Sequence, residues 1–276
     1  MPRTAMKLTA FLAVVFTVLM VTAEAVEAKI VANGLVHYWS FDNADNDTVP
    51  DLAGNNDVEL VRGKSPPLLG GGQSQPKIIE GKIGSAVEFD GDGDYAQSKQ
   101  EIEITGSDPR TLSAWVRFNK FALKQVPVAW GWEGESAQIC QGELYGITAW
   151  DGAGIALWGI CNDHVAPRRF EPDTWTHVTA TYDKKTELKI YVDGELVYDN
   201  ETINPLQTGE DTRATFGKKI FTFADRAWMD GAVDEVAIYD RPLNAGEVKQ
   251  NFLSEGFSVN PAGRLAVSWG AIKDFK

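Results

Sequence analysis

The segment from Trp175 to Val197 constrains the fold more than any other part of the sequence, because it contains two alternating runs separated by a polar break. The runs, residues 176–182 and 188–192, each place apolar side chains on one face and polar side chains on the other, as strands with one buried face do. Asp193 and Gly194 then signal a type I′ turn, whose two central residues both need positive φ. The segment therefore predicts an antiparallel β-meander.

Short strand-like runs recur along most of the chain and are separated by turns rich in Gly, Asp and Asn. Besides the meander they cover residues 34–41, 86–89, 94–96, 112–118, 126–130, 144–150, 155–158, 215–218 and 232–239. One helical turn is predicted near 244–252, where Asn244 is an N-cap and Glu247 follows three residues later. Many short strands and a single helical turn predict an all-β fold, an antiparallel two-sheet β-sandwich or jelly roll.

The N-terminal residues have the pattern of a secretory signal. Arg3 and Lys7 precede an uncharged apolar run, residues 8–21, and small residues follow at Ala25 and Ala28. The apolar run is shorter than the roughly 20 residues that a membrane span needs, which favours a signal peptide over a retained anchor. We therefore expect cleavage after Ala25 or Ala28.

This interpretation divides the chain into three parts. Residues 1–28 are the signal peptide, residues 29–254 are one folded domain, and residues 255–276 are either a last strand or a tail that attaches the protein to a surface. The mature protein is expected to be secreted or held at the cell surface, with no membrane span left after cleavage. The sequence predicts no oligomeric state.

If the protein is exported, its two cysteines, Cys140 and Cys161, enter an oxidising compartment, where disulfides form. They flank the predicted strands at 144–150 and 155–158, and a hairpin of these strands brings the two cysteines near one another. We therefore predict a disulfide between them. The alternative is a pair of buried free thiols.

The net charge of −13 excludes two classes of partner. Nucleic acid and anionic membranes attract proteins with a stripe of Lys and Arg, and no such stripe occurs in the sequence. The expected partner is instead an extracellular glycan or another extracellular protein.

Six sequence blocks in this order resemble the LamG-like jelly roll of the concanavalin A-like lectin/glucanase superfamily. They are W-S-F-D (39–42), A-V-E-F-D-G-D-G-D-Y (86–95), L-S-A-W-V (112–116), W-T-H-V-T-A-T-Y-D (175–183), L-K-I-Y-V-D-G-E-L-V (188–197) and M-D-G-A-V-D-E-V-A-I-Y-D-R-P-L-N (229–244). The resemblance covers residues 33–254 and implies two antiparallel sheets packed face to face. This fold carries glycan-binding modules, adhesion modules, glycosidases and lyases, so it does not decide the function.

The resemblance also implies a structural calcium ion between the loop after the first strand and the penultimate strand. Calcium takes six to eight oxygen ligands from carboxylates, amides and carbonyls, and loops rich in Asp and Asn supply them. The residues expected to bind it are Asp42, Asp45, Asp47, Asn55 and Asp234. The alternative is that these residues only form turns, in which Asp and Asn are common.

A carbohydrate surface is predicted around the hairpin that the cysteines flank. Sugars are recognised by exposed aromatic rings beside polar side chains. The residues expected to contribute are Trp132, Glu133, Trp150, Asp151 and Asn162, because both tryptophans lie at loop edges. The alternative is that these rings fill the core, where most tryptophan surface is buried.

Glycosidase chemistry has little support in the sequence. The E-x-D-x-E pattern of the retaining glucanases is absent, and the adjacent acids Asp234 and Glu235 are expected to point to opposite faces of a strand. The three histidines form no metal-binding pair, and His177 is expected to face solvent or the second face of its strand. We predict an exported non-catalytic module that binds carbohydrate. A structural or adhesive module that binds protein is the alternative, and a glycosidase or lyase is the less favoured third option.

Overall fold

The computed structural model describes residues 29–63, 74–131, 142–159, 161–185, 187–201, 203–210, 212–218 and 228–254. The expected signal peptide, residues 1–28, and the tail, residues 255–276, lie outside the described residues, so both assignments stay predictions. None of the described helices is long and apolar enough to cross a membrane.

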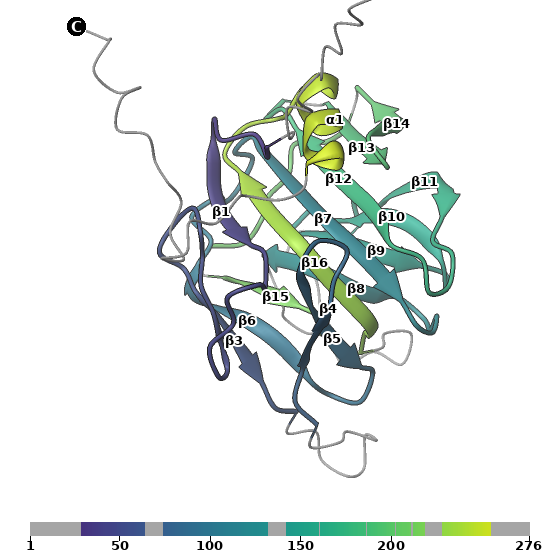
Figure 1. Ribbon diagram of the computed structural model, residues 1–276. Helices are drawn as coiled ribbons and strands as arrows, with labels where there is room; N and C mark the ends of the chain where they lie inside the picture. The colour runs from purple at the N-terminus through teal and green to yellow at the C-terminus, as the bar shows by residue number, and fades with distance from the viewer. Residues whose placement is uncertain are drawn as a thin grey trace, which may run out of the picture.

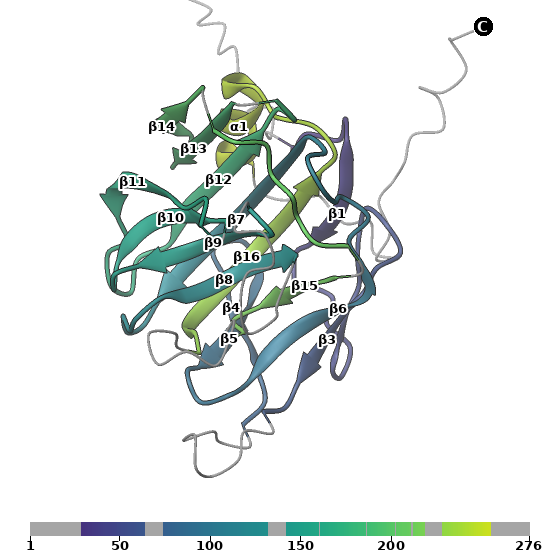
Figure 2. The same ribbon diagram turned by 180° about the vertical axis from the view of Figure 1, so that it is seen from behind.

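The described residues form two antiparallel sheets of eight strands each, which confirms the predicted two-sheet architecture (Figures 1 and 2). The first sheet contains, in spatial order, β14 (Glu195–Asn200), β13 (Leu188–Val192), β12 (Thr176–Tyr182), β7 (Arg110–Phe118), β16 (Asp230–Tyr239), β5 (Ser85–Asp90) and β4 (Lys77–Glu80), with β1 (Leu35–Trp39) paired to β16. The second contains β11 (His164–Arg169), β10 (Gly154–Trp158), β9 (Leu144–Trp150), β8 (Gln125–Gly131), β15 (Arg213–Phe216), β6 (Tyr95–Glu101), β3 (Val58–Val61) and β2 (Thr48–Val49). The chain is therefore a β-sandwich.

The predicted meander forms β12, β13 and β14 at one edge of the first sheet. Val178 pairs with Val192 and Tyr182 with Leu188, so the apolar residues of both strands share a face. Asp193 and Gly194 have φ values of 52° and 75°, as the turn requires. The alternation read from the sequence thus sets both the register and the face that is buried.

The main core lies between the two sheets and contains the apolar face of nearly every central strand. A second cluster lies on the outer face of the first sheet, where Tyr38 and Tyr239 pack against Val248 of the helix α1 (Ala245–Leu253). Asn244 caps this helix and forms a capping box with Glu247, which confirms the prediction for 244–252.

The start of the described chain is held against this helix. Ile30 and Val31 are buried in the second cluster. The backbone N–H of Val31 donates to Asn251 Oδ1 at 2.9 Å, and Gln250 Nε2 donates to the carbonyl of Lys29 at 2.7 Å. The two ends of the domain are therefore side by side, and α1 covers one end of the outer face of the first sheet (Figure 1).

Candidate functional site

A β-bulge in β16 brings two consecutive acids to one face of the first sheet. Val233 and Val236 both point into the core, so Asp234 and Glu235 between them both lie on the outer side. The register against β7 shifts between Asp234 and Ala237, and Glu235 has a φ of 51°. The prediction that these acids point to opposite faces was therefore wrong, because alternation breaks at a bulge.

Asp234 is fully buried beneath the turn between β4 and β5. Its Oδ2 accepts hydrogen bonds from the backbone N–H groups of Lys82, at 2.9 Å, and Ile83, at 3.0 Å. Its Oδ1 has no hydrogen-bond partner among the described residues. A buried carboxylate oxygen without a partner is costly, so a donor or a cation bound at this atom would stabilise the folded protein.

Asp42 reaches the same turn from the loop after β1. Its Oδ1 accepts a hydrogen bond from the backbone N–H of Ser85 at 2.7 Å. Gly84 beside it has a φ of +56°, and a Cβ atom there would collide with the Asp42 carboxylate. The glycine therefore lets the carboxylate of Asp42 approach the backbone of the turn above Asp234.

The electrostatics of the two β16 acids reflect burial beside like charges. Burial raises the pKa of Asp234 to about 8, and the negative charge of Asp42 adds to the shift. Burial also raises the pKa of Glu235 well above its usual value, with further contributions from Asp234 and Asp42, although Tyr38 Oη donates a hydrogen bond to Glu235 Oε2. Glu235 Oε1 is buried and unpartnered among the described residues. The site therefore disfavours the charged form of both acids, and it contains two buried acceptor oxygens without a donor among the described residues.

These features fit a hard cation such as calcium. An ion here would satisfy the two buried acceptors that have no donor, but the carboxylates of Asp42, Asp234 and Glu235 would have to move closer to hold it together, because in the structure their oxygens do not all lie within 4.8 Å of one another. Glu235 was missed from the sequence, since alternation placed it on the opposite face.

The other three residues expected to bind calcium take part in different contacts. Asp45 Oδ1 accepts a hydrogen bond from Asn46 Nδ2 at 2.9 Å, and Asp47 Oδ1 accepts one from Gln75 Nε2. The carbonyl of Asn55 accepts a hydrogen bond from Gln100 Nε2 at 3.0 Å. The structure thus brings Asp42 and Asp234 together, whereas Asp45, Asp47 and Asn55 interact with neighbouring loop and strand residues.

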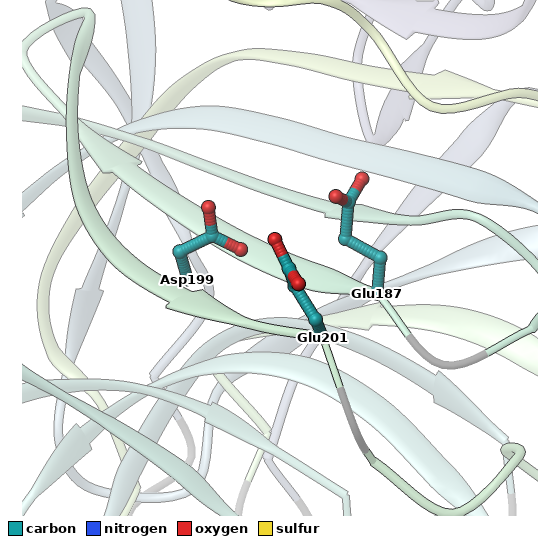
Figure 3. Close-up of side chains that lie close together, drawn as sticks. All are labelled: Glu187, Asp199 and Glu201. Atoms are coloured by element: carbon teal, nitrogen blue, oxygen red, sulfur yellow. The ribbon is translucent and has the colours of Figure 1, made fainter.

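Another group of acids is exposed at the edge of the first sheet, where β13 and β14 lie (Figure 3). Within the described ranges, Glu187, Asp199 and Glu201 are the only three acids whose ligand oxygens all lie within 4.8 Å of one another. Lys189 Nζ lies 2.8 Å from Glu187 and 3.9 Å from Asp199. A lysine already supplies the positive charge here, so this group resembles a solvated surface network.

The predicted carbohydrate surface is described only in part, because Trp132 and Glu133 lie outside the described residues. Trp150 is half-buried at the end of β9 and packs against a small apolar cluster on the outer face of the second sheet, formed by Val126, Ala129, Leu144 and Trp158. Lys124 Nζ lies 3.9 Å from the centroid of the Trp150 ring. Trp150 therefore combines a supported aromatic ring with a neighbouring cation.

Asp151 and Asn162 lie beside this hairpin in different settings. Asp151 is exposed in the turn between β9 and β10, with a φ of 46°. Asn162 Oδ1 lies 3.1 Å from His164 Nε2, and Asn162 Nδ2 donates to the carbonyl of Asn204 at 3.2 Å. Both ends of the Asn162 amide are thus engaged within the protein. Asp151 remains available to a ligand.

Comparison with solved structures places the fold among known binding domains and enzymes. Domain 4 of AbnA, a GH43 extracellular arabinanase from Geobacillus stearothermophilus, in complex with arabinotriose, has a TM-score of 0.58 and 20% identity over 82% of this chain and 98% of that chain. The binding domain of Paraclostridial Mosquitocidal Protein 1 has a TM-score of 0.58 and 18% identity over 80% of this chain and 52% of that chain. Trypanosoma rangeli sialidase in complex with sialic acid has a TM-score of 0.57 and 19% identity over 81% of this chain and 33% of that chain. At these identities the likeness establishes the fold alone.

The sequence itself identifies the family. No curated protein matches the chain. A family model described as the concanavalin A-like lectin/glucanases superfamily matches residues 90–249, which is more than half of the chain. This match agrees with the two antiparallel sheets and with the solved structures that share them. The chain belongs to the concanavalin A-like lectin/glucanase superfamily.

Proposed function

We propose that this protein is an exported, non-catalytic binding module for extracellular carbohydrate, stabilised by a bound calcium ion. The observation that carries the carbohydrate proposal is Trp150, an aromatic ring held at a loop edge on an apolar cluster and flanked by Lys124 and Asp151. The related domain of the arabinanase, whose structure contains arabinotriose, supports this ligand class.

The charge of the protein narrows the class of sugar. With a net charge of −13, the molecule repels polymers that are rich in carboxylate or sulfate groups. A neutral glycan is therefore the expected ligand. Its apolar C–H face would displace Lys124 Nζ, which lies 3.9 Å over the centroid of the Trp150 ring, and would stack there, while its hydroxyls would bind the displaced Lys124 and Asp151.

Calcium and carbohydrate belong to opposite sides of the sandwich. Asp234 and Glu235 lie on the outer side of the first sheet, whereas Trp150 packs on the outer face of the second. The calcium ion in this proposal therefore stabilises the fold and does not contact the sugar. Chelation is expected to weaken glycan binding only as far as it unfolds the protein.

The acids of the first sheet support a structural role better than catalysis. A glycosidase needs two carboxyl groups that reach the sugar from either side of the scissile bond. Asp234 is fully buried and Glu235 nearly so, at 6% exposed. The exposed acids Glu187 and Asp199 are paired with Lys189.

A matched pair of tryptophan variants tests the carbohydrate proposal. Trp150→Ala is expected to lower the affinity for neutral glycans on an array by about tenfold or more, since loss of an aromatic stacking partner costs about 0.5–1.5 kcal/mol beyond its buried area. Trp175 is the control, because it too is half-buried beside a cation, with Arg117 Cζ 5.2 Å from its ring, but on the first sheet. Trp175→Ala is expected to keep the wild-type affinity.

Two results would contradict this assignment. Equal loss of binding in both variants would show a general effect on folding. The second result is a glycan array on which the protein binds nothing. If calcium still raises the Tm of that protein sample, the sample is folded, and the result would favour the adhesive, protein-binding alternative.

Export and the disulfide have a separate test. Cys140 lies outside the described residues, and the described Cys161 is not free. We expect the mature protein to start at residue 26 or 29 and to gain the mass of two hydrogens on reduction, because an oxidising compartment closes the disulfide. N-terminal sequencing and intact mass spectrometry of the exported protein measure both. A protein that keeps residues 1–28, or whose mass does not change on reduction, would contradict the expectation.

A further inference from the structure

A positive charge is buried at one end of the core between the two sheets. Arg110 is the first residue of β7 and is fully buried, on the same face of the strand as the core residue Leu112. Its guanidinium carbon lies 5.5 Å from the ring centroid of Tyr145 and 6.0 Å from those of Trp130 and Tyr182. The guanidinium is therefore enclosed by aromatic rings from both sheets.

The hydrogen bonds of this guanidinium are incomplete. Nε donates to the carbonyl of Asp108 at 2.7 Å, and Nη2 donates to the carbonyls of Thr105 and Gly106, each at 3.0 Å. Nη1 has no partner within the described part of the chain, and neither has the buried hydroxyl of Tyr145. Since guanidinium nitrogens can only donate, the site lacks acceptors.

The nearby acceptors already have donors. The carbonyl of Ile104 accepts from Trp130 Nε1 at 3.0 Å, and the hydroxyl of Tyr182 accepts from the backbone N–H of Leu206 at 3.1 Å. The carbonyl of Gly106, besides Arg110, also accepts from Thr208 at 3.1 Å. What is missing around Nη1 is therefore a group that accepts hydrogen bonds.

The charge of Arg110 also has no described counter-ion in contact with it. The nearest acid along the chain is Asp108, and its exposed carboxylate lies 3.7 Å from Lys184 Nζ instead. Burial lowers the pKa of Arg110 to about 10, with Tyr145, Asp108 and Tyr182 acting in the opposite direction, so the side chain stays charged at neutral pH. A buried cation that is short of both acceptors and negative charge favours an anion as its partner.

We propose that the core holds one halide-sized anion, such as chloride, bound by Arg110 Nη1 and the hydroxyl of Tyr145. A water molecule fits the site less well, because each of its two hydrogens needs an acceptor and the acceptors named above already have at least one donor each. A halide accepts from all the free donors and neutralises the charge. The site is separate from both the carbohydrate and the calcium proposals, so its test does not depend on either.

Bromide crystallography tests the location of the anion. Crystals grown in sodium bromide are expected to show one anomalous peak within hydrogen-bond distance of Arg110 Nη1. Thermal melts give a second readout. When chloride replaces gluconate at constant ionic strength, Tm is expected to rise in proportion to the logarithm of the chloride concentration. No anomalous peak at Arg110, or equal Tm values in the two salts, would overturn the proposal.

A pair of tyrosine variants assigns the effect to this site. Tyr145→Phe keeps the ring and removes one donor, so the apparent halide affinity from the melts is expected to fall about tenfold or more, because a hydrogen bond to a charged group is lost. Tyr191→Phe removes a hydroxyl in the second cluster, beneath α1, and is expected to keep the wild-type response. If Tyr145→Phe also keeps the wild-type response, the anion is not bound at Arg110 and the proposal fails.

Discussion

Calcium is expected to raise the Tm of the chelator-treated protein by about 5–10 °C, and Asp234→Asn is expected to abolish this increase. Without the ion, Asp234 and Glu235 bury two unpartnered oxygens beside the negative charge of Asp42. A ligand at a hundred times its Kd stabilises the folded state by about 2.7 kcal/mol. For a domain of this size each kcal/mol corresponds to about 2–4 °C. Differential scanning fluorimetry in EGTA and in millimolar calcium measures the effect.

Asp234→Asn removes the negative charge of the side chain but keeps an oxygen that accepts hydrogen bonds. An amide oxygen still accepts from the N–H groups of Lys82 and Ile83, so the turn above β16 is expected to stay folded. Asp199→Asn is the matched control in the exposed acidic group, beside Lys189. A calcium response that survives Asp234→Asn and disappears in Asp199→Asn would place the ion at the exposed acids and contradict the buried site.

The fold could be read from the sequence because its signals are local. Alternation over two residues fixes which face of a strand is buried, and the turn at Asp193 and Gly194 fixes how β13 meets β14. The capping box of Asn244 and Glu247 likewise depends only on residues three apart. Each of these patterns survives in the structure, since none requires knowledge of a distant contact.

The candidate sites were harder to predict because they depend on exceptions and on distant contacts. The bulge at Glu235 reverses the face of one acid, and no residue in the sequence signals it. His177 was expected to face solvent or the second face of its strand. It does lie on the outer face, but Phe252 of α1 and Trp115 cover it there, with ring centroids 5.8 Å and 5.1 Å away. Such burial follows only from the docking of a helix that lies far along the chain.

This buried histidine is expected to make the protein less stable in acid. Burial lowers the pKa of His177 to about 3, whereas the unfolded chain binds the proton near the ordinary value of 6.5. Between these values the unfolded state holds more protons, so stability falls as the pH drops below 6.5. The loss from His177 is about 2.7 kcal/mol at about pH 4.5, two units below the unfolded pKa. Burial also lowers the pKa of His164, to about 4, which adds a loss of the same sign.

Other titratable groups make the protein more stable in acid. The histidine effect must therefore be measured as the difference in the free energy of unfolding between the wild type and a variant. The raised pKa values of Asp94, about 7, and Asp234, about 8, make stability fall as the pH rises above 3.8. His177→Asn removes the histidine contribution. Its shorter amide does not reach Ser113 Oγ, which lies 3.0 Å from His177 Nε2, but this hydroxyl keeps its contact with Thr179 Oγ1 at 2.9 Å. Urea denaturation from about pH 4 to 7 is expected to show a free energy of unfolding for His177→Asn that depends less steeply on pH than that of the wild type, by up to about 1.4 kcal/mol per pH unit. Parallel curves for the two proteins would mean that His177 is protonated in the folded state, against the burial that α1 and Trp115 impose on it.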